Sequence, residues 1–462
     1  MELLELPLEI FRQILTELIY NIDPGALIQL QLVNKTFARE AMTLVFSTRR
    51  FRVLDGLYHP SAPRYLCKRA FAPDADDFYA IRTIRHTANW MAGQSGFLDR
   101  PQQICLSLSR SAVVHKLPIL WDALGRDEKR EGGMQTSDAL EHRLSAAACL
   151  GDLSLVKTLI ADGANVNGQS DILGTPLANA SLEGHSTVVQ FLLNEGADID
   201  GGATEWTEAE RKTVETWSSI ILPLRFGATL FPTHGGFSPR TPLGAAAFAG
   251  QEETVKILLD PSRNLSRSTF GFYHSITYAA IGGNVEVLRM IMNAGDLDTL
   301  SKPITKRLLD SALKASASKG HLASMKILLD SGAPVHLSIP QEYESSALVY
   351  AAQVGRNDAI KLLLDKGADV SDDDDMDFAP LGQAIQGDYI RTVALLLDHG
   401  ARVYSYKMRA LPLAGDFGSW AVMKLLLEKS AHRRDPIGAQ DAVKEAERRN
   451  RPDIAALLRA SR

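Results

Sequence analysis

The amino-acid sequence predicts an all-α protein: a small helical domain, a mostly helical connector, and a solenoid of helix pairs with short β-hairpin loops. Two observations lead to this fold class. From about residue 137 the sequence repeats itself with a period near 33 residues, and the first 50 residues read as two helices of a different character. The length of 462 residues exceeds what one hydrophobic core supports, which agrees with a repeat array.

The composition is that of an ordinary globular protein. Hydrophobic residues make up 45% and charged residues 23% of the chain, and the formal net charge is −5, which does not favour nucleic acid or a membrane surface as a partner. The three cysteines, Cys67, Cys105 and Cys149, form no C-x-x-C pair, so neither a disulfide framework nor a zinc site is indicated. We expect a cytoplasmic and/or nuclear protein with no signal peptide or membrane span.

The first predicted helix carries more apolar surface than one side of a helix usually buries. It begins "LPLEIFRQIL", in which Pro7 suits a first helical turn because its missing N–H would be unpaired there. Leu6, Ile10 and Ile14 recur every four residues, and a second apolar stripe runs beside them. A surface helix usually buries a single stripe of about 100°. The second stripe therefore requires a partner or another part of the chain.

A turn at residues 23–25 separates this helix from a second one, "ALIQLQLVNKTFAREAMTLVF". Together they read L-P-x-E-I-x-x-x-I-L, a turn, then L-x-x-L-x-x-V-x-x-x-F, which resembles the F-box motif over residues 4–46. In that family the segment docks on a Skp-type adaptor of a cullin–RING ubiquitin ligase. The resemblance implies an adaptor contact through Leu6, Pro7, Ile10, Ile14 and Leu15, continued or supported by Leu30, Val33 and Phe37. The alternative is a two-helix cap packed on the rest of the chain.

The F-box-like domain is assigned to residues 1–50 and the connector to residues 51–136. Helical runs such as "QQICLSLSRSAVVHKLPILWDAL" fill the connector, and we expect it to pack against the first repeat. The polar, Gly-containing segment 125–138 marks the boundary with the repeats.

Residues 137–462 contain the repeats. In each one an Ala-rich helix precedes a glycine turn, a Leu-rich helix and a Gly-Ala pair; Gly163 and Gly196 lie 33 residues apart, as do Gly367 and Gly400. This period, with T-P-L opening a helix, resembles the ankyrin repeat. We count eight or nine repeats, although the histidine that follows T-P-L in the family is absent. Stacking is required because one unit cannot bury its own apolar face.

Three further assignments concern particular parts of the array. Thr175 is placed to cap a helix that opens at Pro176. Residues 201–240 are interpreted as a degenerate repeat, with a plain insertion as the alternative. The polar segment 442–462 is interpreted as a C-terminal cap, which solenoids need for solubility.

No motif for catalysis withstands inspection. "HGGF" (234–237) lacks a nucleophile motif to serve, and no phosphate-binding loop or zinc-protease helix occurs. His185 and His321 occupy the turn between helices, where a structural role is expected. We therefore expect no enzyme activity, metal or cofactor.

Ankyrin arrays bind partners on the exposed side of their inner helices and at their hairpin tips. The resemblance implies that an unidentified target protein contacts Leu182, Glu183, Phe248, Ile281, Gln353, Val354 and Gln386 on inner helices, and Asp372, Asp373, Asp374 and Asp375 on a hairpin. The acidic run is either a solvated loop or an electrostatic contact for a basic segment.

The sequence thus predicts a substrate-recognition subunit of an F-box ubiquitin ligase, which holds its target in the ankyrin array. An interaction scaffold unconnected to ubiquitin is the alternative. An enzyme built on a repeat scaffold is a remote third.

Overall fold

The structure is a computed structural model, and it describes most of the chain beyond residue 61. The described residues are 62–71, 79–94, 101–125, 136–170, 172–201, 241–267, 269–295, 297, 302–336, 345–371, 379–403, 409–416, 420–429, 431, 435–448 and 451–460. The F-box-like segment 1–50 lies outside them.

The chain divides into two compact units. Unit 1 contains the described helices up to Ser275, and unit 2 contains the helices from Ile276 onward, apart from residues 293–295. The boundary falls within one helix, α14 (Phe270–Gly282). The described elements of both units are helices, as the sequence predicts for an all-α repeat array.

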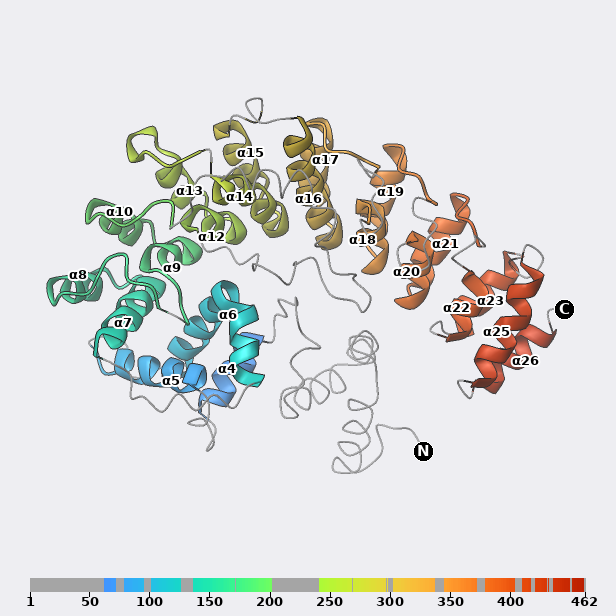
Figure 1. Ribbon diagram of the computed structural model, residues 1–462, viewed down its shortest axis with the longest axis horizontal. Coiled ribbons are helices and arrows are strands. Elements are labelled where there is room, and N and C mark those ends of the chain that lie inside the picture. Colours follow the sequence, from blue (N-terminus) through green and yellow to red (C-terminus); the bar gives the residue numbers. More distant parts are fainter. Residues whose placement is uncertain are drawn as a thin grey trace. The chain divides into compact units, whose positions relative to one another are not determined.

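Unit 1 combines the connector with the first repeats (Figure 1). The connector helices are α4 (Ala62–Ala70), α5 (Tyr79–Ala92) and α6 (Pro101–Gly125). The inner helices of the repeats are α7 (Thr136–Leu150), α9 (Pro176–Glu183) and α12 (Pro242–Ala249). The outer helices are α8 (Leu153–Ala161), α10 (Ser186–Asn194) and α13 (Glu252–Leu259), followed by a 3-10 turn at Pro261–Arg263.

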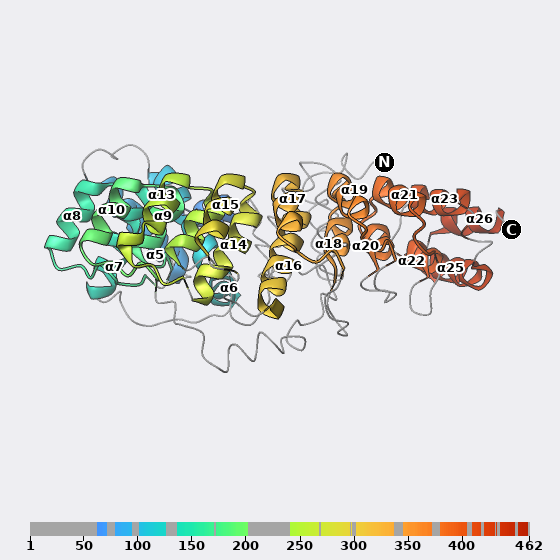
Figure 2. The ribbon, with the colours of Figure 1, turned by 90° about the horizontal axis from the view of Figure 1, so that it is seen from above.

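Unit 2 continues the pattern after α14, as the two rows of Figure 2 show. Its inner helices are α16 (Lys302–Lys319), α18 (Ala347–Gln353), α20 (Pro380–Gln386), α22 (Ala410–Asp416) and α25 (Pro436–Arg448). Its outer helices are α15 (Val285–Ala294), α17 (Leu322–Asp330), α19 (Asn357–Asp365), α21 (Ile390–Asp398), α23 (Trp420–Glu428) and α26 (Pro452–Ala460).

The helix ends follow the local chemistry that the sequence predicts. Thr175 Oγ1 accepts a hydrogen bond from the Ala178 N–H at 3.3 Å, and Thr241 Oγ1 accepts one from Gly244 N–H at 3.0 Å. In both repeats proline occupies the next position, where no N–H is needed. These caps confirm the role predicted for Thr175.

The repeat containing α9 stacks directly on the repeat containing α12. The two inner helices contact each other, as do the outer helices α10 and α13. Ser266 N–H donates to Asp200 Oδ1 at 3.1 Å, which ties the two loops together. No place for a stacked unit remains between them. The predicted degenerate repeat, and its alternative of a plain insertion, fall on residues 202–240, which lie outside the described part.

The connector is helical where it is described, and α6 lies at its centre. Helix α6 contacts α4 and α5 on the connector side and α7 on the repeat side. From Leu108 to Val114 every side chain except that of Arg110 is buried. Serine and alanine occupy three of these positions, and small side chains allow helices to approach closely. Helix α5 also reaches the first repeat, where the Arg143 guanidinium lies 4.4 Å from the centre of the Trp90 ring.

One contact recurs between successive repeats and satisfies a carbonyl at the end of four inner helices, α7, α9, α14 and α16. The last C=O groups of a helix have no partner within it. The residue that precedes an outer helix reaches back to such a carbonyl in the preceding repeat. The pairs are His185 Nε2 and Cys149 O (3.0 Å), Gln251 Nε2 and Leu182 O (3.1 Å), His321 Nε2 and Ile281 O (3.1 Å), and Arg356 Nε and Ser318 O (3.2 Å). A carbonyl only accepts, so both histidines carry hydrogen on Nε2.

A glycine two residues after each of these carbonyls makes room for the side chain. Gly151, Gly184, Gly283 and Gly320 all have positive φ. A Cβ on Gly283 would stand 2.6 Å from His321 Cε1, and one on Gly151 would stand 2.5 Å from His185 Nδ1. Glycine is therefore required at these positions for two reasons: the left-handed backbone, and the close approach of the side chain from the next repeat. Sequence analysis assigned His185 and His321 to this turn without the contact.

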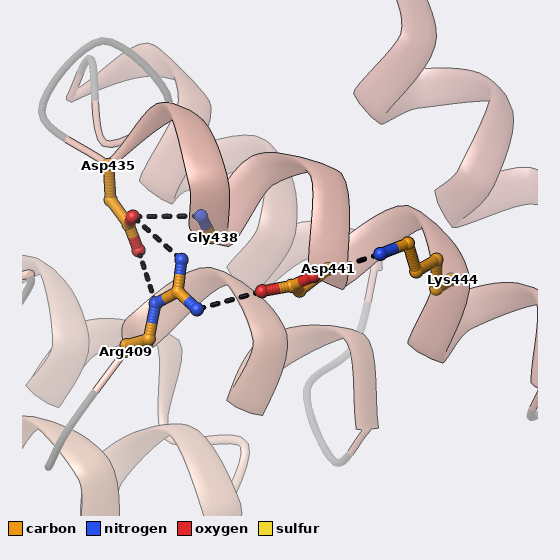
Figure 3. Close-up of polar contacts among 5 residues, drawn as sticks. All are labelled: Arg409, Asp435, Gly438, Asp441 and Lys444. Atoms are coloured by element: carbon orange, nitrogen blue, oxygen red, sulfur yellow. Dashed lines mark hydrogen bonds and ion pairs between the residues drawn. The ribbon is translucent and has the colours of Figure 1, made fainter.

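The last helix pair is joined to the preceding repeat of unit 2 by a charged network (Figure 3). The Arg409 guanidinium donates to both oxygens of Asp435, from Nη2 at 3.0 Å and from Nε at 3.2 Å, and to Asp441 Oδ2 from Nη1 at 2.8 Å. Asp435 is 4% exposed and also accepts the Gly438 N–H at 2.8 Å, which caps α25. The pairing raises the pKa of Arg409 and lowers that of Asp441. The final pair begins at Pro436, before the predicted cap segment 442–462.

The loop after α8 carries one antiparallel bridge, between Ser170 and Gly174, in place of a longer hairpin. No helix in the described residues is long and apolar enough to cross a lipid bilayer.

The recurrent contact predicts different costs for two substitutions. Gly283 (φ +77°) and Gly332 (φ +91°) share a left-handed backbone, but a Cβ on Gly332 meets nothing within 4 Å. Gly332→Ala should lower the free energy of unfolding by about 1–2 kcal/mol for the backbone alone. Gly283→Ala should lower it by about 1 kcal/mol more, because His321 must leave the Ile281 carbonyl. Urea unfolding of the full chain, followed by circular dichroism, measures both; equal losses would contradict the contact.

Candidate interaction surfaces

The inner-helix face of unit 1 holds three of the predicted target contacts. Leu182 and Glu183 end α9, and Phe248 lies near the end of α12. Leu182 is only 5% exposed, and Phe248 is half-buried. The residue that covers them is Val114 of α6, itself 6% exposed, which forms an apolar cluster with Leu182, Ala245 and Phe248. This face is therefore occupied by the chain itself, and a target could reach Leu182 only if α6 moved.

Polar contacts fix α6 on this face. The Ser111 hydroxyl donates to Asn179 Oδ1 in a buried hydrogen bond. The amide nitrogen of Asn179 donates to the carbonyls of Leu173 at 3.0 Å and Thr175 at 2.9 Å. Because both amide hydrogens are used by carbonyls, the oxygen of Asn179 must point away from them, toward α6. The orientation of Asn179 is therefore set by its own repeat before α6 binds.

Glu183 forms an ion pair at the edge of the same face. Its Oε2 lies 3.8 Å from Arg110 Nη1, and the two side chains are 20% and 49% exposed. The other oxygen, Oε1, is buried and has no hydrogen-bond partner in the described residues. Burial raises the pKa of Glu183, while Arg110 and His185 oppose the rise. The carboxylate is thus held in a site that satisfies its charge incompletely.

The Cys149 thiol lies beneath this edge. Its Sγ donates to the Ser107 carbonyl of α6 at 3.9 Å. Burial, and then the charge of Glu183, raise the pKa of Cys149, so the thiol stays protonated and unreactive. The three cysteines are free thiols, and Cys67 Sγ donates to the Gln102 carbonyl at 3.3 Å. The described residues contain no group of three or more histidine, cysteine, aspartate or glutamate side chains able to hold a metal ion.

The inner helices of unit 2 present the remaining predicted contacts. Val354, at the end of α18, is 37% exposed, and Gln353 beside it is half-buried. Gln386 ends α20 and is also half-buried, as is Ile281, whose carbonyl accepts the His321 hydrogen bond. Their role in target binding stays a prediction.

A basic residue, Arg356, follows Val354 by two positions. Partial burial and the nearby positive charge of Arg356 lower the pKa of Lys319, at the end of α16. The charge of Arg356 also opposes the rise that burial produces in the pKa of Tyr389. This part of unit 2 therefore combines an exposed valine with two cationic side chains.

The other predicted site residues lie outside the described part of the chain. These are Asp372 to Asp375 and all eight adaptor contacts, from Leu6 to Phe37. Sequence reasoning missed Arg110, Ser111 and Val114, which contact the repeats. The only signal was the run "SLSRSAVV", a helix with small residues on several sides, which does not say what it packs against.

Two segments of the chain match family descriptions of ankyrin repeats. Residues 276–374 match the three-copy form, and residues 144–193 match the form with many copies. The chain contains ankyrin repeats. It is an ankyrin-repeat protein-interaction module, in which inner and outer helices stack as described above.

Two curated relatives each match about a fifth of this chain. The ankyrin repeat and KH domain-containing protein mask of Drosophila melanogaster is 33% identical over 98 residues, which is 21% of this chain and 2% of that protein. Mask-1 of Caenorhabditis elegans is 35% identical over 95 residues, again 21% of this chain and 4% of that protein. The crystal structure of the human ASB11 ankyrin repeat domain shares 23% identity, covers 62% of this chain and 96% of that chain, and gives a TM-score of 0.32.

The burial of Glu183 predicts that replacing it with glutamine stabilises the protein in a pH-dependent way. Burial raises the pKa of Glu183 in the folded state. The favourable contribution of Glu183 to the free energy of unfolding is therefore complete below its ordinary pKa of 4.5, and it is lost as pH rises through the folded-state pKa. Glu183→Gln should therefore raise the free energy of unfolding by about 1 kcal/mol at pH 7, the scale of a poorly satisfied buried polar group. The gain should vanish near pH 4.

Urea unfolding at the two pH values measures this gain. Glu195→Gln, at an exposed carboxylate, is the matched control and should change little at either pH. A less stable Glu183→Gln protein at pH 7 would show instead that the ion pair with Arg110 outweighs the burial.

Proposed function

We propose that the protein is the substrate-recognition subunit of a cullin–RING ubiquitin ligase. Residues 1–50 would dock a Skp-type adaptor, and the ankyrin array would hold the target protein. The observation that carries the proposal is the F-box-like spacing at residues 6–15, where a helix with two apolar stripes is predicted, joined to an array of ankyrin repeats. The mechanism is proximity: the subunit does no chemistry, but raises the effective concentration of the target near the ubiquitin-charged enzyme.

The packing of the connector supports this reading over an N-terminal cap. A solenoid needs its first inner helix covered, and α5 and α6 both contact α7. That position is therefore filled by residues 79–125 without the first two predicted helices. This supports a partner chain, in place of the repeats, as what the second apolar stripe of the first predicted helix binds.

The proposal is tested by co-purification with the adaptor. Wild-type protein should retain a Skp-type adaptor, and Leu6→Asp with Ile10→Asp should lose at least nine-tenths of it, because charge would enter an apolar interface. Ile390→Asp with Ile437→Asp is the matched control, since both isoleucines are exposed in unit 2, at 41% and 67%. That control should retain the adaptor. Failure of the wild-type protein to retain it would overturn the ligase role.

The alternative, a scaffold unconnected to ubiquitin, makes a different prediction for deletion of residues 1–46. If those residues capped the repeats, the deletion would lower the melting temperature of the array. The docking role predicts nearly unchanged melting, because α5 and α6 already cover α7. Circular dichroism of the deleted and full chains separates the two.

A further inference from the structure

On the face that α6 covers, two neighbouring repeats carry different residues, and the difference matches the side chains that α6 presents. The repeats "TPLANASLEG" and "TPLGAAAFAG" align residue by residue from Thr175 and Thr241. Asn179 and Glu183, which contact α6, occupy positions where the next repeat has Ala245 and Ala249. Of these two repeats, only the one that contains Asn179 and Glu183 thus presents an amide and a carboxylate to Ser111 and Arg110.

The contacts of α6 follow helical spacing. Arg110 and Val114 are four residues apart, so they lie on the same side of the helix, with Ser111 beside them. Arg110 pairs with Glu183 at the edge, Ser111 bonds Asn179 in the interior, and Val114 enters the cluster of Leu182 and Ala245. An ion pair, an oriented hydrogen bond and an apolar anchor are the usual elements of helix recognition in a groove.

We propose that α6 is an in-cis ligand of the inner-helix face of unit 1, and that it closes this face to the target. The face is a helix-binding site, and its occupant is the Arg-Ser-x-x-Val side of α6 in this chain. The target is then confined to inner helices that α6 does not cover, such as α18 with exposed Val354. The inference rests on the proposed function in one respect, that the repeats hold a target; the docking of α6 is independent of the ligase.

The test uses a fluorescein-labelled peptide of residues 101–125, titrated into the full chain and followed by fluorescence anisotropy. In the wild-type protein the face is occupied, so the peptide must compete with a tethered copy of itself. Val114→Asp in the protein removes the anchor of the tethered helix and frees the face. We expect this variant to bind the peptide at least about tenfold more tightly than wild type.

Two controls make the titration specific. Val354→Asp, at an exposed valine of unit 2, should behave like wild type. A peptide that itself carries Val114→Asp should not bind the Val114→Asp protein. Equal binding of the unmodified peptide to wild type and Val114→Asp, or binding to neither, would overturn the proposal.

If Val114→Asp fails to fold, exchanging the charges of Arg110 and Glu183 tests the docking of α6 instead. Arg110→Glu places two carboxylates together and should lower the melting temperature, and Arg110→Glu with Glu183→Arg should restore most of the loss. Lys326→Glu, at an exposed lysine on α17, should change little. Absence of rescue in the double variant would contradict docking through this pair. None of these substitutions touches residues 1–50, so a failed adaptor test leaves the result standing.

Discussion

The fold depends on how each inner helix ends. A helix pair of this kind cannot bury its apolar face alone, so pairs must stack closely, and at four inner helices the close approach lies where carbonyls lack partners within the helix. A glycine in the left-handed conformation makes the approach possible, and a side chain from the next repeat supplies the missing donor. The donor is histidine, glutamine or arginine in different repeats, with nitrogen–oxygen distances of 3.0–3.2 Å. The geometry is therefore kept while the chemistry of the donor varies.

The need to cover the apolar face of a helix pair also explains how the connector packs. At α7, the first inner helix in the described part of the chain, α5 and α6 provide the cover, and α6 extends over α9 and α12 through Ser111 and Val114. At the other end, Arg409 holds the last helix pair through Asp435, a carboxylate that is almost fully buried. The first end uses an apolar helix and the second uses a charged network. Only the first removes surface that a target would otherwise use, so the two units differ in what they offer a partner.

Much of the array could be predicted from sequence because its signals are local. The glycine period, the Thr-Pro starts and the Ala-rich inner helices each follow from backbone chemistry within one repeat. The direct stacking of the repeats on either side of 201–240 could not be predicted, because a spacing near the period fits a degenerate repeat as well as an insertion. The docking of α6 could not be predicted either. Arg110 and Glu183 are 73 positions apart, and neither local sequence pattern indicates that the two side chains meet. Leu182 was assigned to an open surface for the same reason.

Hydroxyl-radical footprinting with mass spectrometry tests the central claim, that α6 closes the inner-helix face of unit 1 while that of unit 2 stays open. Leu182 and Val354 are aliphatic residues near the ends of α9 and α18, and they are 5% and 37% exposed. The account predicts that Val354 is oxidised several times faster than Leu182 in the native full chain, and that Val114 is protected together with Leu182. Equal rates at Leu182 and Val354 would show that α6 does not cover this face, and would contradict the account.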